Sequence, residues 1–246
     1  MRTAALIMVF LLPVSALLGE DIFSLASKGS AADLRAAIAG GAKVDARDSK
    51  GWTPLMRAAE LAMDPAVISV LIGARARVTD ADPKGLTALI IASRSNVRPE
   101  IVKALLAAGA AVNGASQDGE TPLLAAAAGN SNPAVMTALL AAGADVNAKN
   151  ADGLSAIQLA AMLNDNPQVI AVLVKAKARV DERGPGGRTA LMYAAAYSTN
   201  PDMVAALLKA GADWKLKSEA GLSAYDYAKA NPALKGTFVM RVLAPR

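Results

Sequence analysis

The sequence contains neither cysteine nor histidine in its 246 residues. Without thiolate and imidazole groups there is no cysteine nucleophile, no histidine general base and no Cys/His zinc site. An exported form would fold without disulfides. The absence of cysteine therefore does not indicate whether the protein works in an oxidising or a reducing compartment. Thiolate and imidazole chemistry is therefore excluded.

Aromatic residues are also scarce, at 4%, whereas hydrophobic residues make up 54% and charged residues 19%. This balance argues against a disordered chain. Alanine, leucine and valine dominate the apolar set, which suits closely packed helices better than a β-sandwich. The net charge of +5 is small for a nucleic-acid binder, so we expect no nucleic-acid partner and a weak preference for acidic partners.

The first residues have the pattern of a targeting segment. Arg2 supplies a positive start, and an apolar stretch over positions 4–18 follows it. This stretch is shorter than the roughly 20 residues that span a bilayer and contains a proline, which favours a cleaved signal over an uncleaved anchor. Cleavage is expected after Ala16 or Gly19. We therefore expect a signal peptide over residues 1–19, a periplasmic or secreted protein, and no membrane span after cleavage.

One glycine and one proline each recur at the same fixed interval along the chain. The glycines are Gly51, Gly85, Gly119, Gly153, Gly187 and Gly221. The prolines are Pro65, Pro99, Pro133, Pro167 and Pro201. Two markers that keep one period between residues 51 and 221 indicate an array of repeats.

The unit over residues 116–149 shows what each position does. Gly119 suits a tight turn with positive φ, and Thr121 with the following proline can cap and begin a helix. Pro133 begins a second helix in the same way, and Gly143 is placed to end it in the left-handed conformation. Each unit is therefore predicted to hold two short helices joined by a turn.

This unit resembles the ankyrin repeat. The pattern D-x-x-G-x-T-P-L-x-x-A-A occurs over residues 48–59, and L-L-x-A-G-A-x-V-N-A occurs over 139–148. The resemblance covers about residues 21–235. It implies an all-α repeat fold, an α-solenoid, in which ankyrin helix–turn–helix units are joined by β-hairpin-like turns.

The unit departs from the usual ankyrin repeat in three ways. It is longer by one position than the usual repeat of about 33 residues, with the extra residue in the turn between the helices, as in bacterial ankyrin proteins. Met56, Ile90, Leu124, Gln158 and Met192 replace the usual histidine. Arg75 and Lys177 replace two helix-ending glycines. Either these two residues carry a left-handed strain of about 1 kcal/mol, or their helices end differently.

The periodicity gives a layout for the whole chain. Residues 20–47 are predicted to form an N-terminal capping repeat and residues 218–246 a C-terminal one, because the exposed end faces of a solenoid need polar caps. Five full repeats lie between the caps: 48–81, 82–115, 116–149, 150–183 and 184–217.

No catalytic constellation is visible in the sequence. The acidic residues lie mainly at turn positions, where turn and cap hydrogen bonds are expected: Asp45, Asp48, Asp82, Asp118 and Asp152. Residues 184–187 are glycine-rich, but neither a preceding strand nor a following Lys-Ser/Thr marks them as a phosphate loop. We therefore expect no enzyme, no cofactor and no metal site.

The resemblance implies that a partner binds the concave side, at positions that vary between repeats. The candidate partner-binding residues are Lys50, Trp52, Lys84, Leu86, Arg94, Glu120, Met162, Arg188 and Tyr197. Tryptophan, tyrosine and arginine are the residue types that most often anchor interfaces. The alternative roles are structural: Trp52 can cover the N-terminal cap, Tyr197 can pack on Tyr193, and Arg94 can be simply solvated.

The sequence thus favours an exported ankyrin-repeat scaffold that binds another protein through its concave face. One form of this function is an accessory factor for an exported enzyme. The alternative is a binder of an anionic envelope surface or polymer, which would lose affinity steeply with salt. An enzyme is the third hypothesis. We expect a monomer, and the sequence does not identify the partner.

Overall fold

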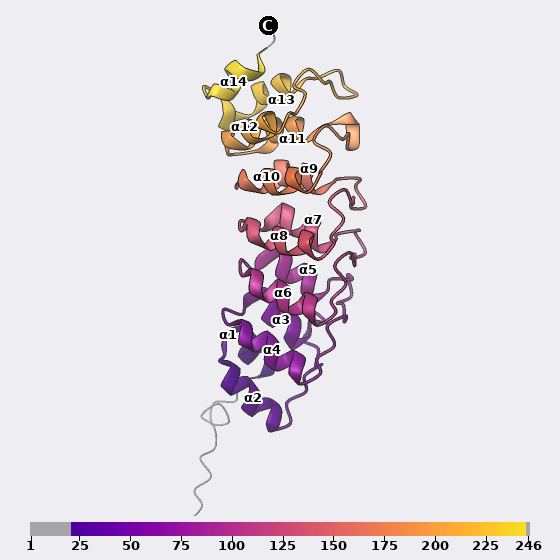
Figure 1. The fold of residues 1–246 in the computed structure, drawn as a ribbon, viewed down its shortest axis with the longest axis vertical. Coiled ribbons are helices and arrows are strands. Elements are labelled where there is room, and N and C mark those ends of the chain that lie inside the picture. The colour runs from indigo at the N-terminus through magenta and orange to yellow at the C-terminus, as the bar shows by residue number, and fades with distance from the viewer. Residues whose placement is uncertain (1–20, 245–246) are drawn as a thin grey trace, which may run out of the picture.

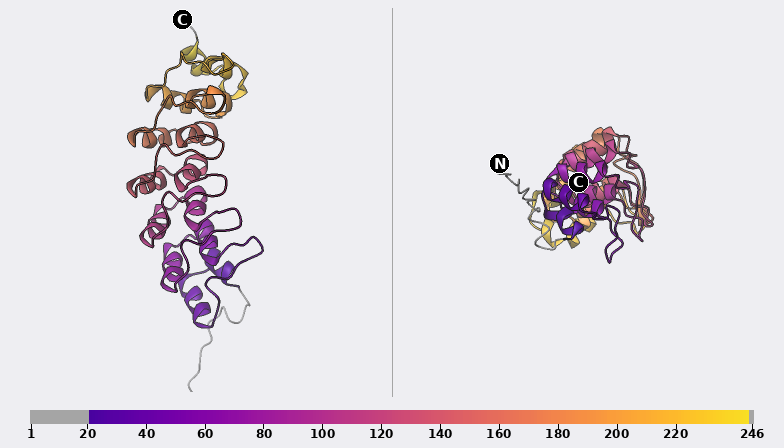
Figure 2. Two further views of the ribbon diagram at one scale, coloured as in Figure 1. Left: turned by 90° about the vertical axis from the view of Figure 1, so that its right-hand side faces the viewer. Right: turned by 90° about the horizontal axis from the view of Figure 1, so that it is seen from below.

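The structure is a computed structural model that describes residues 21–244. These residues form an elongated stack of paired short helices, with hairpin turns projecting along one side (Figures 1 and 2). The predicted signal peptide over residues 1–19 lies outside the described residues. None of the described helices combines the length and the apolar character needed to cross a membrane.

The fold class predicted from the sequence, an α-solenoid, is confirmed for the described residues. The first helices of the pairs are α1 Ile22–Lys28, α3 Pro54–Leu61, α5 Ala88–Ser95, α7 Pro122–Gly129, α9 Ala156–Leu163, α11 Ala190–Tyr197 and α13 Ala224–Ala230. The second helices are α2 Ala31–Ala39, α4 Pro65–Gly73, α6 Pro99–Ala107, α8 Pro133–Ala141, α10 Gln168–Lys175, α12 Pro201–Lys209 and α14 Phe238–Leu243. Short 3₁₀ turns, η2 Pro185–Gly187 and η3 Pro232–Leu234, complete the described elements.

The odd-numbered helices contact one another in succession and form one layer, and the even-numbered helices form the other. Alanine makes the first layer possible. Ala59, Ala126 and Ala160, for example, are fully buried between neighbouring helices. Their small side chains let the helices approach closely at the packing density of a protein interior. The hydrophobic core is therefore one continuous column along the stack.

The helices of the repeat over residues 116–149 begin at the caps that the sequence predicts. Thr121 accepts a hydrogen bond from the Leu124 N–H at 3.3 Å, and Asn132 accepts one from the Ala134 N–H at 3.0 Å. These bonds satisfy backbone donors that the first turn of a helix leaves unpaired. In the next repeat α10 differs, because it begins at Gln168, directly after the proline expected to start it.

Two helices end on a strained residue. Arg75 and Lys177 have φ of 66° and 72°, the left-handed conformation that Gly143 adopts with φ of 89° at the equivalent position. The sequence allowed either a left-handed residue or a different kind of helix end at these two positions, and the structure has the left-handed residue. Each costs about 1 kcal/mol relative to glycine.

Buried asparagines link successive helix pairs. We call Asn96, Asn130, Asn164 and Asn231 the asparagine ladder. Asn130 Nδ2 donates to the carbonyl oxygens of Ser93 and Asn96 in the preceding repeat, at 2.9 and 3.0 Å. Its Oδ1 accepts from the Asn132 N–H at 2.9 Å. Because the residue is 1% exposed, these bonds replace water for several backbone groups at once.

The ladder is interrupted where Ser198 occupies the equivalent position. Its Oγ exchanges hydrogen bonds only with the backbone of Asn200, at 3.0 and 3.1 Å. Among the described residues, no side-chain bond from position 198 reaches the preceding repeat. The exposed turn partly compensates, since Thr199 Oγ1 donates to Asp165 Oδ1 at 2.8 Å. Asn200 Nδ2 donates to the Asp165 carbonyl at 2.8 Å, as Asn132 and Asn166 donate at the preceding joins.

A second set of interrepeat bonds runs along the hairpin tips. The backbone N–H groups of Gln117 and Ala151 donate to the carbonyl oxygens of Lys84 and Asp118 at 3.0 and 2.9 Å. Pro185 stands at the equivalent position one repeat later and has no N–H to donate. In the described structure, the join between residues 150–183 and 184–217 therefore lacks both the ladder bond and the tip bond.

Candidate partner-binding face

The candidate residues lie along one side of the stack, which we call the inner face: the hairpin turns and the adjoining exposed parts of the odd-numbered helices. Six of them are on the turns: Lys50, Trp52, Lys84, Leu86, Glu120 and Arg188. Arg94, Met162 and Tyr197 lie on α5, α9 and α11. Side-chain contacts involving these residues form three groups, at the N-terminal end, the middle and the C-terminal end.

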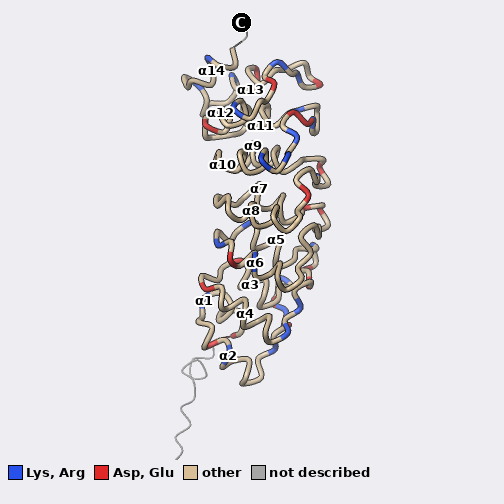
Figure 3. The backbone as a smooth tube through the Cα atoms, in the orientation of Figure 1, with Lys and Arg blue, Asp and Glu red and all other residues tan. Residues whose placement is uncertain are grey.

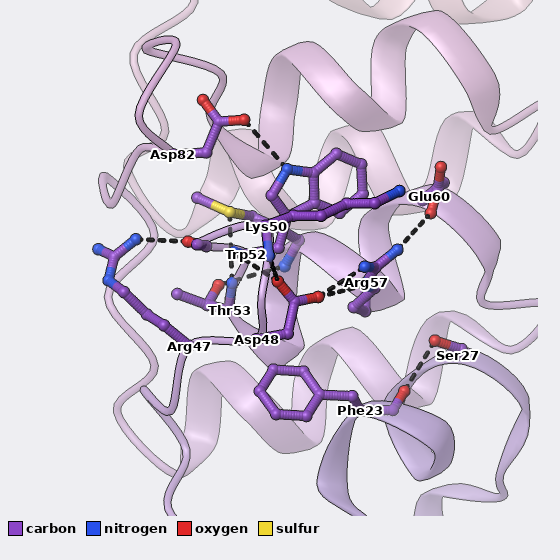
Figure 4. Close-up of polar contacts among 12 residues, drawn as sticks. Phe23, Ser27, Arg47, Asp48, Lys50, Trp52, Thr53, Arg57, Glu60 and Asp82 are labelled. Atoms are coloured by element: carbon purple, nitrogen blue, oxygen red, sulfur yellow. Dashed lines mark hydrogen bonds and ion pairs between the residues drawn. The ribbon is translucent and has the colours of Figure 1, made fainter.

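At the N-terminal end, Trp52 is held on several sides (Figure 4). Its Nε1 donates to Asp82 Oδ2 at 3.0 Å, which ties it to the next repeat. The Arg57 guanidinium lies 4.6 Å from the indole centroid, and Lys50 Nζ lies 5.8 Å from it. Trp52 is therefore half-buried and packed against the core as well as placed on the inner face.

Asp48 neutralises this group. Its carboxylate accepts from Arg57 Nε and Nη2 at 2.8 and 2.6 Å, and from the backbone N–H groups of Lys50 and Trp52 at 2.8 and 3.0 Å. Although partial burial raises the pKa of Asp48, the hydrogen bonds from Arg57 and the backbone lower that pKa overall. Arg57 also pairs with Glu60 at 3.4 Å, so its positive charge is compensated twice.

In the middle of the inner face, Arg94 of α5 forms an ion pair with Glu120 on the next hairpin turn. One expectation from the sequence was that the Arg94 side chain is simply solvated. In the structure it is paired with Glu120 instead. Gly129 provides room beside it, since a Cβ there would lie 3.1 Å from Arg94 Cγ. The charges of Arg94 and Glu120 therefore cancel each other.

At the C-terminal end, Arg188 is surrounded by phenol groups. We call Arg188, Tyr193, Tyr197 and Tyr227 the arginine–tyrosine cluster. Arg188 Nη1 donates to the Tyr197 hydroxyl at 3.1 Å, and its Nε donates to the Tyr227 hydroxyl at 3.2 Å. The guanidinium lies 4.9 Å from the Tyr227 ring centroid, within the range of a cation–π contact.

The tyrosines of this cluster hold one another in place. The rings of Tyr193 and Tyr197 are stacked, with centroids 6.4 Å apart and planes at 24°, so the packing considered for Tyr197 is present. Tyr193 donates to the Pro185 carbonyl at 3.3 Å, and burial raises the pKa of its phenol. Tyr227 donates to Ser218 at 3.0 Å.

Arg188 differs from the other two arginines of these groups in its charge balance. Arg57 and Arg94 each contact a carboxylate, whereas no Asp or Glu within residues 21–244 forms an ion pair with Arg188. The hydrogen bond to Tyr197 raises the pKa of its guanidinium further. Arg188 therefore presents a positive charge that no carboxylate of residues 21–244 compensates.

Exposed apolar side chains lie beside both outer groups. Leu61 and Met63, at the end of α3 and in the next turn, are 48% and 70% exposed. Leu163 and Tyr197 occupy equivalent positions on the neighbouring helices α9 and α11 and are 56% and 52% exposed. Clusters of this kind are typical of protein contact surfaces.

A hollow on the described residues lies away from the inner face, between α10 and α12. Its volume is about 530 Å³, and it is lined mainly by Ala171, Val174 and Ala206 with Lys175 and Lys209 at its edge. It contains no group suited to catalysis and none of the candidate residues.

Sequence reasoning did not name Arg57 or Tyr227 as part of these groups, and it named Tyr193 only as the packing partner of Tyr197. Arg57, Tyr193 and Tyr227 hold the same position in their respective units, and this periodic relationship was the available signal. Lys84, Leu86 and Met162 also lie on the inner face. Leu86 and Met162 pack against the core, and only the backbone N–H of Lys84 has a hydrogen-bond partner among the described residues. Their role in binding remains a prediction.

Comparison with known families agrees with this architecture. A family model described as ankyrin repeats (3 copies) matches residues 62–150 and 124–218, which together span more than half of the chain. The protein therefore belongs to the ankyrin repeat family. Ankyrin repeats generally mediate protein–protein interactions, and members of the family are typically non-enzymatic binding scaffolds.

One similar solved structure is the human ASB11 ankyrin repeat domain. The two share 23% sequence identity with a TM-score of 0.78, over 91% of this chain and 96% of that domain. At this level of identity the match establishes the fold alone. No curated protein sequence matches the chain.

Proposed function

We propose that this protein is an exported ankyrin-repeat scaffold that binds another protein through its inner face. The observation that carries the proposal is the variation at one repeat position. The residue after the recurring turn glycine is Trp52, Leu86, Glu120, Leu154 or Arg188, so the repeat imposes no single residue type there. Leu154 is buried and Leu86 packs against the core, whereas Trp52, Glu120 and Arg188 are partly exposed and are available for recognition.

Large side chains at the two ends of this face support binding at separate points. Trp52 and Tyr197 are pre-positioned by intramolecular contacts, so little side-chain entropy is lost when a partner covers them. Exposed aliphatic residues lie next to each group. A folded partner that spans the stack would therefore gain two anchored contacts.

Export and the nature of the partner complete the proposal. The arginine and apolar stretch at the start of the sequence support secretion, and a scaffold in that compartment would serve as an accessory factor for an exported enzyme. Terminal sequencing of protein recovered from the periplasm or medium tests export. A mature chain beginning at Leu17 or Glu20 is expected, and an intact Met1 in the cytoplasmic fraction would contradict it.

Affinity capture tests the binding proposal. Tagged mature protein is cross-linked in native envelope extract, and captured proteins are identified by mass spectrometry. A Trp52→Ala, Tyr197→Ala variant and an outer-face variant, Lys103→Ala, Thr137→Ala, are run in parallel. The last two positions are exposed on α6 and α8.

The proposal expects a protein that is captured by the wild type and the outer-face variant and is lost with the inner-face variant. Equal capture by all three proteins would show that the inner face is not the site. A variant with a changed circular dichroism spectrum is replaced by the milder Tyr197→Phe, so that loss of folding is not mistaken for loss of contact.

The alternative function, binding to an anionic envelope surface or polymer, depends on the basic charge of the chain. In the described residues, lysines and arginines are spread along the stack and interspersed with acidic residues (Figure 3). Protein binding is therefore the favoured proposal. Binding to vesicles of anionic lipid that disappears between about 50 and about 200 mM salt, together with failed protein capture, would favour the alternative.

A further inference from the structure

We propose that Arg188 is the anchor for an acidic residue of the partner, an Asp or Glu side chain with an aliphatic residue beside it. This inference rests on the proposed function and specifies the chemistry of the bound segment. It comes from the contrast along the inner face of the described structure, where carboxylates neutralise Arg57 and Arg94 and none pairs with Arg188.

The hydrogen bonds of Arg188 leave room for a carboxylate. A guanidinium carries five N–H donors. Two are used, from Nε and Nη1, and both go to neutral phenol oxygens. The remaining donors, on Nη1 and Nη2, can form the paired hydrogen bonds with which arginine recognises a carboxylate.

Tyr197 supplies a further donor on the same side. Its oxygen accepts from Arg188, and its own O–H has no acceptor among the described residues. A carboxylate held by Arg188 can therefore also accept from Tyr197. Tyr227 cannot serve in this way without losing a bond, because its O–H already donates to Ser218.

The surroundings explain why the partner residue next to the acid should be aliphatic. The Tyr197 ring is 52% exposed, and Leu163 is 56% exposed at the equivalent position on the adjacent helix. An aliphatic side chain would cover both. Covering them would also remove water from the Arg188 charge, which strengthens a charge-assisted hydrogen bond.

The backbone of Arg188 is fixed before any partner arrives. Its carbonyl accepts from the Gly184 N–H at 2.9 Å and from Gln158 Nε2 at 3.3 Å. The residue before it, Gly187, has φ of 67°, a conformation that favours glycine. Arg188 is thus held at the end of a rigid turn, and binding requires little reorganisation.

A random dodecapeptide display library, selected on immobilised residues 20–246, tests the inference. The wild type should enrich peptides with Asp or Glu adjacent to Leu, Ile, Val or Met. An Arg188→Gln array should lose the acid preference. Arg94→Gln is the matched control, since it removes an inner-face arginine that is already paired with Glu120, and should keep that preference.

Synthetic peptides then measure the contact directly. The best peptide and its Glu→Gln or Asp→Asn analogue are titrated by fluorescence anisotropy. The acidic form should bind the wild-type array at least about tenfold more tightly, as expected for a charge-assisted hydrogen bond. The same change should make little difference on Arg188→Gln, because the two changes remove the same interaction. Tyr197→Phe should weaken binding of the acidic peptide a few-fold, because it removes the hydroxyl donor.

Three results would overturn the inference. The first is an unchanged acid preference on Arg188→Gln. The second is equal binding of the acidic and amide peptides to the wild type, a measurement that does not depend on folding of any variant. The third is a set of acid-free peptides that still require Trp52 or Tyr197, which would leave the proposed inner-face function intact. If no selected peptide depends on the inner face, both proposals fail.

Discussion

Asn130 donates from its side chain to the backbone carbonyl of Asn96, and Asn96 donates in the same way to Ala62, one repeat earlier. Each residue thus caps the end of its own helix and ties that end to the preceding repeat. Because both side chains are buried, loss of one leaves polar backbone groups without water or protein partners.

Replacement of Asn130 by alanine is expected to lower the free energy of unfolding by about 3 kcal/mol. The substitution removes donors to Ser93 and Asn96 and the acceptor for the Asn132 N–H. A buried unsatisfied group costs about 1–3 kcal/mol. Urea denaturation followed by circular dichroism measures the change.

Gln117→Ala is the control for that measurement. Gln117 Nε2 also donates to a carbonyl of the preceding repeat, Pro83 at 2.9 Å, but at an exposed site. Water can replace this bond, so the loss should be below about 1 kcal/mol. Equal losses for the two substitutions would show that burial does not give the ladder its strength.

Introducing the missing asparagine should strengthen the interrupted join. Ser198→Asn places a side-chain amide at the position equivalent to Asn130 and Asn164. Ser198 is 4% exposed, so the new amide would be buried as well. Two additional bonds should raise the free energy of unfolding by about 1–2 kcal/mol. Hydrogen exchange of α11 amides should slow in parallel. A lower stability would mean that the larger side chain does not enter the site.

The left-handed helix ends allow a reciprocal test. Lys177→Gly relieves strain at φ of 72° and should stabilise the protein by up to about 1 kcal/mol, after the entropy of glycine in the unfolded chain is subtracted. Gly143→Ala introduces the same strain at φ of 89°. It should destabilise by about 1 kcal/mol, since the added Cβ meets no other atom and only the backbone strain counts. Thermal denaturation of both variants checks the opposite signs.

The carboxylate of Asp48 should make stability depend on pH. Its pKa is lower in the folded state than in the unfolded chain, where an aspartate titrates near about 3.9. Its stabilising contribution is therefore complete above that value and is lost as the pH falls through the folded pKa. Asp48→Asn should cost about 2 kcal/mol at pH 7 and less at pH 3.

The measurement for Asp48 is urea denaturation of the wild type and Asp48→Asn at both pH values. Asp118→Asn serves as the control, because the Asp118 side chain is exposed and forms no hydrogen bond in the described structure. It should leave the unfolding free energy unchanged at both pH values. A constant cost for Asp48→Asn would show that the charge is unimportant.

The regular parts of the fold could be predicted because each is repeated. Gly119 and its equivalents recur at one fixed interval, and each has the positive φ expected of a tight turn. The caps at Thr121 and Asn132 depend only on residues two or three positions away. Local chemistry of this kind is readable from one sequence.

The contacts between repeats were harder to predict. Trp52 finds its partner at Asp82, and Arg188 finds one at Tyr227, 30 and 39 residues further along the chain. Each pairing depends on how the stacked turns are offset, which the repeat pattern does not specify. The asparagine ladder could have been predicted from the sequence, since Asn96, Asn130 and Asn164 recur with the period of the repeat.

The interrupted join affects how two units of the stack are coupled. The stability of such an array is approximately the sum of its units and of their nearest-neighbour contacts, so a join without these two bonds couples its units less strongly. Arg188, Tyr197 and Tyr227 all lie beyond the join between residues 150–183 and 184–217 and are bonded to one another. Gln158 Nε2 donates to the Arg188 carbonyl across this join, and the Asp213 N–H donates to Asp181. These two bonds keep the turn that carries Arg188 in register with the preceding repeat, although the ladder bond and the tip bond are missing there.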